Sequence, residues 1–350
     1  MHESNQLKTN QFQSNVYTIM KRIIPFFFIS LFAGGVFADV GTVTVTVLSS
    51  EPVTGITEID YEFTENAYVY DISAEVSFDN GNSFESIPDA DLKGALTNVA
   101  PGGPYSLIWD GGASFPETFS DETVIKIEAT ATTFTCGEDL TFTYNGQEVT
   151  YGTVLIDYGG DIGERCWLDR NLGANQVATS STDEEAYGDL FQWGRGDDGH
   201  QDRTSSTTNT SSNTDVPGHG DFITVEFITE NAPYDWRSSR NNALWQGVEG
   251  INNPCPPGWR VPVRDELNAE RLSWSAGAAG PIDSDLKWPL AGYRSFSNGS
   301  LQSVGTWGTV WSSSSVDSDG RSRGLTFYGS YRAIGTFFRA EGRSVRCIKD

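Results

Sequence analysis

Basic residues are scarce in this sequence. Lysine and arginine total 23 against 47 aspartates and glutamates, which gives a formal net charge of −24 at pH 7. Such a chain repels polyanions, so nucleic acid and anionic membrane surfaces are excluded as electrostatic partners. Histidine is scarcer still, with 3 residues, and no Cys-x-x-Cys pair occurs. This composition argues against a metal site built from histidine and cysteine, and we expect no cofactor.

Long apolar runs are also rare, and the one that is present lies near the start. A basic pair, Lys21 and Arg22, precedes sixteen residues, 23–38, that end in small side chains before Asp39. This arrangement predicts a signal peptide over residues 1–38. Met20 is an alternative start, which would leave residues 1–19 untranslated. A membrane anchor is the other interpretation, but the run is shorter than the about 20 residues that span a bilayer. We therefore expect an exported protein, secreted or on the cell surface, that does not span the membrane after cleavage.

Cysteine is limited to four residues, all beyond the predicted cleavage site: Cys136, Cys166, Cys255 and Cys347. An even number of cysteines in an oxidising compartment predicts disulfides. Four cysteines allow three pairings. We favour Cys136–Cys166 together with Cys255–Cys347, the second of which would tie the last strand to the body of its domain.

Charge divides the exported chain into two parts. Residues 39–135 hold 2 basic residues against 17 acidic ones, whereas residues 136–350 hold 18 against 29 and contain all four cysteines. Nine of the ten tryptophans also lie in the second part. These shifts predict two domains, residues 39–135 and residues 136–350.

The first domain consists of short segments with strand patterns. Residues 42–47 alternate threonine with valine, residues 125–129 alternate apolar with charged side chains, and Gly- and Asn-rich turns separate the segments. Short strands at this spacing predict an all-β sandwich. Residues 76–110 also resemble the immunoglobulin-like modules that precede binding domains in exported bacterial proteins. No catalytic constellation is present, so we interpret this domain as a spacer.

The second domain mixes strands, loops and one helix. An Asn-Gly turn predicts a hairpin between residues 140–144 and 149–158. Residues 196–220 are rich in Ser, Thr, Asn, Gly and Asp, which predicts a surface loop. A helix is predicted from Pro262, because two acidic residues and then apolar residues at helical spacing follow it. Short strands return after residue 288.

Six segments of this domain, in order, resemble the Fibrobacter succinogenes major paralogous domain. They are CWLDRNLGA at 166–174, YGDLFQWGR at 187–195, NPCPPGWRVP at 253–262, LAGYR at 290–294, VWSSS at 310–314 and RSVRC at 343–347. The resemblance covers residues 136–350. It implies an irregular α+β fold similar to C-type lectins, and through them to the formylglycine-generating enzyme, with function on long loops.

The lectin resemblance does not carry over to a calcium site. Sugar-binding C-type lectins hold Ca²⁺ with Glu-Pro-Asn or Gln-Pro-Asp and with Trp-Asn-Asp, and none of these strings occurs here. A loop metal site built from His200 and His219 with Asp197, Asp198 or Asp202 is an alternative, but polar residues on a solvated loop explain the same pattern.

Catalysis also finds little support. The string Gly-x-Ser-x-Gly occurs once, at residues 320–324, but it lies among the predicted short strands and not at the strand-to-helix turn that a nucleophile elbow requires. A divergent formylglycine-generating oxidase would need two free cysteines as copper ligands, for which Cys255 and Cys347 are the candidates by position. Because these two cysteines fit a disulfide better, we predict that the protein is not an enzyme.

Residues 293–338 have the composition of a recognition surface. Tyr, Phe and Arg alternate with Gly and Ser, as in antibody paratopes and interface hot spots. The candidate ligand-binding residues are Tyr293, Arg294, Phe296, Asn298, Tyr328, Tyr331, Arg332, Phe337 and Phe338. We expect them to project from loops, with Tyr331 and Arg332 as the best pair, and we expect Trp307 and Trp311 in the core.

The sequence therefore predicts a non-catalytic binding protein with an extracellular glycan or protein ligand. A lectin-like domain of this kind suits a target of retroelement-driven diversification, for which residues 293–338 have the right position and composition. The alternative is a structural envelope protein without a specific ligand.

Overall fold

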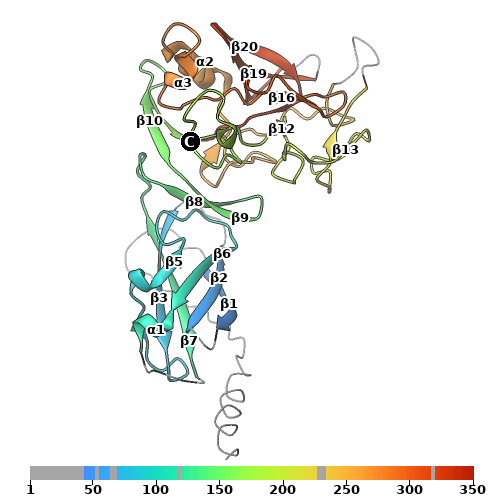
Figure 1. Cartoon of the computed structure of the whole chain (residues 1–350). Helices are drawn as coiled ribbons and strands as arrows, with labels where there is room; N and C mark the ends of the chain where they lie inside the picture. The colour runs from blue at the N-terminus through green and yellow to red at the C-terminus, as the bar shows by residue number, and fades with distance from the viewer. Residues whose placement is uncertain are drawn as a thin grey trace, which may run out of the picture. The chain divides into compact units, whose positions relative to one another are not determined.

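The structure is a computed structural model that describes residues 43–51, 55–63, 69–116, 118, 120, 122–226, 234–316 and 320–350. It divides into two compact units, one ending at Thr133 and the other spanning Phe134–Asp350 (Figure 1). The predicted signal peptide, residues 1–38, and its cleavage site lie outside the described residues. Strands dominate both units, and the described part contains three short α-helices. None of these helices has the length and hydropathy needed to cross a membrane.

The first unit is built from two antiparallel sheets. Its elements are β1 (Val43–Glu51), β2 (Ile56–Phe63), β3 (Val69–Ser77), β4 (Glu85–Ser86), β5 (Leu92–Gly94), β6 (Tyr105–Asp110), α1 (Gly111–Ser114) and β7 (Val124–Thr132), with a 3-10 turn at Asp89–Asp91. One sheet has the order β1-β2-β6-β5 and the other β4-β3-β7. Buried side chains from both sheets form a single core. The strand segments expected in this half are therefore present among the described residues, and residues 69–77 form one continuous strand, β3.

Alternation explains why these segments are strands. In β3 the side chains of Ile72, Ala74 and Val76 are buried, whereas Asp71 and Ser73 between them are exposed. A period of two places one set of side chains against the core and the other in solvent. The same pattern appears in β6, where Tyr105, Leu107 and Trp109 are buried.

The described residues of the second unit form many short strands and two helices. They are β8 (Leu140–Tyr144), β9 (Gln147–Tyr151), β10 (Thr153–Asp157), β11 (Glu164–Leu168), β12 (Phe191–Gln192), β13 (Thr207–Thr208), β14 (Phe222–Ile223), β15 (Trp259–Arg260), α2 (Arg264–Ser273), α3 (Gly280–Asp283), β16 (Tyr293–Arg294), β17 (Leu301–Gln302), β18 (Gly308–Ser315), β19 (Arg321–Tyr328), β20 (Tyr331–Phe338), β21 (Gly342–Arg343) and β22 (Ile348–Lys349), with a 3-10 turn at Glu184–Ala186. The larger sheets have the orders β10-β11-β22-β15, β12-β21-β16-β17 and β18-β19-β20.

The predicted hairpin is present, but its second strand is shorter than expected. Asn145 and Gly146 both have positive φ, as a two-residue type I′ turn requires. The strand predicted over residues 149–158 breaks at Gly152, after which β10 pairs with β11 instead. Gly152 donates its N–H to the carboxylate of Asp169 at 3.1 Å, and a Cβ on Gly152 would lie 2.6 Å from that carboxylate. The break therefore depends on a contact with a residue outside the hairpin.

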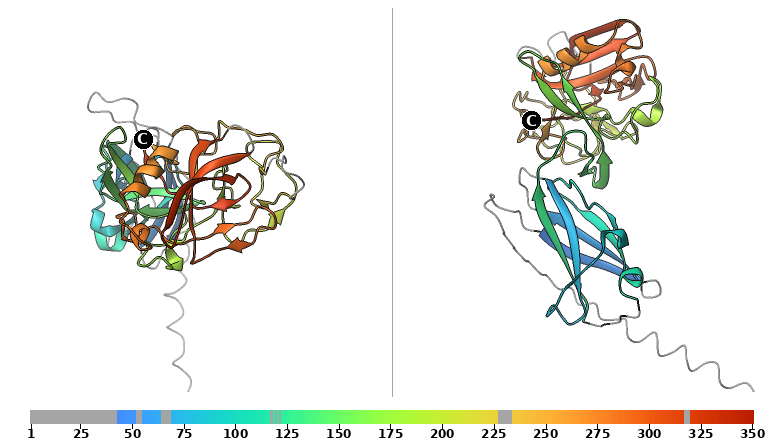
Figure 2. Two further views of the ribbon diagram at one scale, coloured as in Figure 1. Left: turned by 90° about the horizontal axis from the view of Figure 1, so that it is seen from above. Right: turned by 90° about the vertical axis from the view of Figure 1, so that its left-hand side faces the viewer.

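Helix α2 lies against one face of the sheet β18-β19-β20 (Figure 2). It begins two residues after the predicted start at Pro262, and Glu266 accepts the N–H of Val263 at 2.8 Å, which caps its first turn. Leu267, Trp274 and the sheet residues Leu325 and Phe327 form the core between helix and sheet.

A buried carboxylate at the end of α2 connects three aromatic side chains. One oxygen of Glu270 accepts hydrogen bonds from the indole N–H groups of Trp274 and Trp288, at 2.7 and 2.8 Å. The other accepts the hydroxyl of Tyr158 at 2.7 Å. Charge-assisted bonds of this kind satisfy a buried anion and fix the surrounding rings.

Both predicted cysteine pairs are disulfides in the structure. The Cα atoms of Cys136 and Cys166 lie 5.8 Å apart, as do those of Cys255 and Cys347, within the range for disulfides. Cys347 directly precedes β22, which pairs with both β11 and β15. The second disulfide therefore ties the last strand to the body of the unit, as expected.

Two glycines allow the segments 166–174 and 187–195 to pack closely against each other. A Cβ on Gly173 would lie 2.5 Å from the Asp189 carboxyl, and a Cβ on Gly188 would lie 2.4 Å from the carbonyl oxygen of Leu172. The Asp189 carboxylate accepts the hydroxyl of Tyr144 at 2.7 Å. Its burial raises the pKa of Asp189 to about 6.

The segment predicted as a surface loop, residues 196–220, is partly interior. His200 and Gln201 are fully buried, and Thr207–Thr208 form β13, which pairs in parallel with β14. The prediction of a surface loop is wrong at His200 and Gln201, because composition does not show that the backbone N–H groups of Gln192 and Leu190 bond these two residues in the interior.

Candidate ligand-binding surface

Three aromatic residues occupy one cross-strand row of the sheet β18-β19-β20. Gly308 pairs with Phe327, so Trp307, one residue earlier, lies opposite Tyr328, and Tyr328 in turn pairs with Tyr331. Residues directly opposite each other point to the same face of a sheet. We call Trp307, Tyr328 and Tyr331 the aromatic row.

The rings of the aromatic row stack on one another. The ring centroids of Trp307 and Tyr328 are 4.7 Å apart with an interplanar angle of 12°, and those of Tyr328 and Tyr331 are 4.8 Å apart with an angle of 25°. These distances equal the spacing of neighbouring strands, about 4.8 Å. Tyr293 lies behind Trp307 at 6.3 Å. The stacking thus follows from the strand register.

The aromatic row is exposed to solvent. Tyr331 is 49% exposed and Trp307 is 37% exposed, whereas the other nine tryptophans of the chain are buried. The expectation that Trp307 lies in the core is wrong, and the expectation for Trp311 is confirmed. Trp307 and Trp311 share one face of β18, but Phe337 and Arg343 cover only Trp311.

A tight turn holds Trp307 in place. The backbone N–H of Trp307 donates to the carbonyl of Ser303 at 2.9 Å, and its own carbonyl accepts the N–H of Gly292 at 2.8 Å. Ser303 has a φ of 55°, in the left-handed region. A fixed backbone reduces the entropy that an exposed ring loses when it binds.

A buried arginine, Arg343, packs against Tyr293, the neighbour of Trp307. The guanidinium carbon of Arg343 lies 3.6 Å from the ring centroid of Phe337 and 5.3 Å from that of Tyr293. Arg343 is 4% exposed and donates from Nε and Nη2 to Glu341, while its Nη1 has no hydrogen-bond partner among the described residues. Its contacts orient the ring of Tyr293.

The predicted candidates divide between the two ends of β20. Tyr293, Tyr328 and Tyr331 come together at the start of the strand. Phe296 and Phe338 pack with Tyr234 at the other end, about 23 Å away at 3.3 Å per residue. The single loop face expected over residues 293–300 and 328–338 is therefore wrong, because residues 331–338 form a strand.

The expected exposure of Arg294 is also wrong. Arg294 is 3% exposed, and its guanidinium donates to the carbonyls of Gly299 and Asp202 at 2.7 and 3.0 Å. It also bonds Ser205. These bonds hold the segment around residue 200 to β16, so Arg294 is a structural residue.

The remaining candidates have separate surroundings. Arg332 is half-buried and donates to the carbonyls of Trp274 and Ser275 at 3.2 and 2.8 Å. Asn298 is exposed and caps its own turn by accepting the N–H of Ser300. Phe337 covers Arg343, as described above. Composition therefore did not show which of these candidates are exposed and which are held by contacts within the unit.

The loop metal alternative conflicts with the surroundings of His200. Its Nε2 accepts the backbone N–H of Gln192 at 2.9 Å, and its Nδ1 lies 2.6 Å from the Asp198 carboxylate. Burial lowers the pKa of His200 to about 4, so the ring is neutral at pH 7. Both ring nitrogens are engaged. No group of three or more metal-ligating side chains occurs in the part of the chain that the structure describes.

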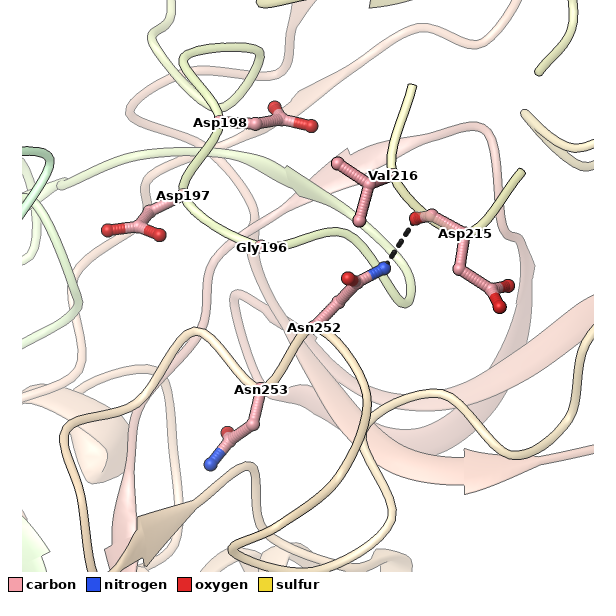
Figure 3. A pocket seen from close by; sticks show the side chains of 7 residues that line it. All are labelled: Gly196, Asp197, Asp198, Asp215, Val216, Asn252 and Asn253. Atoms are coloured by element: carbon pink, nitrogen blue, oxygen red, sulfur yellow. Dashed lines mark hydrogen bonds between the residues drawn. The ribbon is translucent and has the colours of Figure 1, made fainter. Parts of the chain in front are cut away.

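Asp198, the partner of this histidine, also lines a small pocket (Figure 3). It is lined by Gly196, Asp197, Asp198, Asp215, Val216, Asn252 and Asn253. Asp198 binds Arg195, Asp215 binds Arg237, and the amide of Asn252 donates to the carbonyl of Asp215 at 2.6 Å. The polar side chains that line the pocket thus already have partners, most of them outside the lining, so we interpret the pocket as a packing feature.

The copper alternative conflicts with the disulfides. It requires free thiols on Cys255 and Cys347, and these two residues are bonded to each other.

Comparison with known proteins gives no relative: no protein-family model, curated protein or solved structure matches the chain. The interpretation of the aromatic row therefore depends on its own geometry.

Proposed function

We propose that this is an exported, non-catalytic binding protein that recognises its ligand through the aromatic row. One observation carries the proposal: Trp307 is the single exposed tryptophan of ten, and it is stacked with Tyr328 and Tyr331 at the end of a rigid sheet. Large aromatic side chains on a surface are costly to leave in water and are enriched at binding hot spots.

The ligand is an extracellular glycan or a protein. Stacked rings offer an apolar surface, and the phenol and indole groups at their rims donate hydrogen bonds. Both ligand classes present apolar patches bordered by polar groups. Since Trp307 and Tyr331 are exposed, the row suits an extended ligand better than a small molecule that needs an enclosed pocket.

In this proposal the first unit is a spacer and the second is the recognition module. In the first unit, the sheets β1-β2-β6-β5 and β4-β3-β7 have the order of strands A-B-E-D and C′-C-F of an immunoglobulin-like sandwich, which supports that assignment. In the second, long irregular connections and few helices support the C-type-lectin-like fold of the Fibrobacter succinogenes major paralogous domain. The disulfides and the apolar run at residues 23–38 support export.

Arrays of glycans and extracellular proteins test the proposal. Chains starting at Asp39 are compared as wild type, Tyr331→Ala and the control Leu272→Ala, which alters a 65%-exposed side chain on α2. A hot-spot loss of about 2 kcal/mol lowers affinity about thirtyfold for Tyr331→Ala. The control retains wild-type affinity.

Two results would count against the proposal. Unchanged affinity of Tyr331→Ala and Trp307→Ala for an array-selected ligand would place recognition elsewhere. Absence of binding on all arrays would favour a structural envelope protein.

A further inference from the structure

The outer edge of β20 is unpaired in the described part of the chain. The sheet order is β18-β19-β20, and β20 is its outermost strand (Figure 1). The turn Gly329–Ser330 makes Tyr328 and Tyr331 the closing pair of the hairpin, so alternate residues from Tyr331 onward bond β19. The N–H and C=O groups of Arg332, Ile334 and Thr336 therefore face outward, and they make no hydrogen bond to described residues.

This edge lacks the features that normally protect edge strands. β20 is eight residues long, contains no proline or lysine, and pairs with β19 without a register shift. Its one charged residue, Arg332, is turned toward the carbonyls of Trp274 and Ser275. Natural proteins normally block a long regular edge with charges, proline or a bulge, because such an edge pairs with other chains.

The aromatic row ends at this same edge. The ring of Tyr328 is stacked on both sides, by Trp307 and by Tyr331. Among the described residues, the ring of Tyr331 stacks only with that of Tyr328. A further strand beside β20 would lie about 4.8 Å away, which is also the spacing between the rings of the row. Its residue opposite Tyr331 would therefore extend the stack by one ring.

We propose that β20 binds an extended segment of a partner protein by strand addition, with an aromatic residue of the partner stacked on Tyr331. Backbone bonds to Arg332, Ile334 and Thr336 supply affinity, and the stack sets the register. The inference rests on the proposed function, because Tyr331 belongs to both.

Charge favours a foreign acidic segment over a second copy of this chain. The strands β18, β19 and β20 carry Arg321, Arg323 and Arg332 and no acidic residue, although the whole chain has a net charge of −24. Pairing two β20 edges would bring two such cationic sheets together. An acidic, aromatic segment complements the net positive charge of this sheet.

Peptide binding to the wild-type chain tests the proposal. The probe is an eight-residue peptide, the length of β20, of alternating threonine and valine with two glutamates and a C-terminal tyrosine, so that an antiparallel strand places this ring opposite Tyr331 and reaches Thr336. Two isomers carry N-methyl groups on one or the other alternate set of amides. Because a strand bonds its neighbour through one set only, one isomer loses at least tenfold in affinity and the other stays near the parent.

Protein variants provide the matching test. Thr336→Pro removes an outward N–H while sparing the bonds to β19, since proline is tolerated at such edge positions, and it weakens binding at least tenfold. Thr336→Val keeps the N–H and binds as wild type. Tyr331→Phe keeps the ring and stays within twofold, whereas Tyr331→Ala loses at least tenfold. If Thr336→Pro does not fold, the N-methyl isomers still decide.

Three outcomes would overturn strand addition. If both isomers bind like the parent while Tyr331→Ala still loses binding, the row binds without edge pairing; the proposed function stands and this inference fails. If the wild type sediments as a dimer and Thr336→Pro as a monomer, the occupant is a second copy. If the peptide does not bind at millimolar concentration, the edge does not accept such segments.

Discussion

The alanine variants of Trp307 and Trp311 should differ in stability, because the first ring lies on the surface and the second in the core. Trp311 is fully buried, and its indole N–H donates to the carbonyl of Phe191 at 2.8 Å. Trp311→Ala loses burial and leaves a cavity, which costs about 3–5 kcal/mol, and it also leaves a buried carbonyl without its donor. Trp307→Ala loses a stacking contact of about 0.5–1.5 kcal/mol and part of its burial, but water fills the space. We therefore expect Trp307→Ala to lower the free energy of unfolding by at least about 2 kcal/mol less than Trp311→Ala does.

Guanidinium unfolding followed by tryptophan fluorescence measures both costs. Trp109 is the one tryptophan in the first unit, so the signal reports mainly on the second. Equal losses for the two variants, within about 1 kcal/mol, would refute the assignment of Trp307 to a binding surface, because it would then be a core residue.

Three further predictions concern the framework of the second unit. Glu270→Ala leaves two buried indole donors and the half-buried hydroxyl of Tyr158 without their acceptor. At about 1–3 kcal/mol for each buried indole, the free energy of unfolding should fall by at least about 2 kcal/mol in urea titrations; a loss under 1 kcal/mol would contradict the network. For Asp189, the pKa raised to about 6 means that the folded state holds its proton at higher pH than the unfolded state, so this carboxyl lowers stability as pH rises from about 4 to 6. Asp189→Asn should accordingly be more stable than wild type at pH 7, by up to about 3 kcal/mol, with the difference vanishing near pH 4; a difference that does not change with pH would contradict this. Cys347→Ser opens a loop with a sequence separation of 92 residues, which costs about 4–5 kcal/mol in the chain-entropy account and lowers Tm by about 10 °C or more; an unchanged Tm in calorimetry would contradict it.

Local sequence patterns predicted the strands of the first unit and the helix α2 well. Strand alternation and helical spacing depend on neighbours along the chain, and burial in β3 and β6 follows them. The break at Gly152 was not predictable, because it depends on the carboxylate of Asp169, seventeen residues away. Likewise, the interior position of His200 depends on partners that composition does not show.

The candidate site was predictable by residue type and less so by position. Alternation places Trp307 and Trp311 on one face of β18, but it cannot tell that Phe337 and Arg343 cover only one of them. Arg294 stands in a Tyr-Arg-Ser-Phe segment typical of recognition surfaces, yet carbonyls from the segment around residue 200 enclose its guanidinium. Both differences arise from long-range packing.

Hydroxyl-radical footprinting of the chain from Asp39, with and without the array-selected ligand, tests the central claim most directly. Without ligand, the exposed rings of Trp307 and Tyr331 should be oxidised readily, as should the control Leu272. With ligand, we predict that oxidation of Trp307 and Tyr331 falls while that of Leu272 is unchanged. Protection confined to the first unit or to α2, with both rings still oxidised at the free rate, would contradict the assignment of the aromatic row as the binding surface.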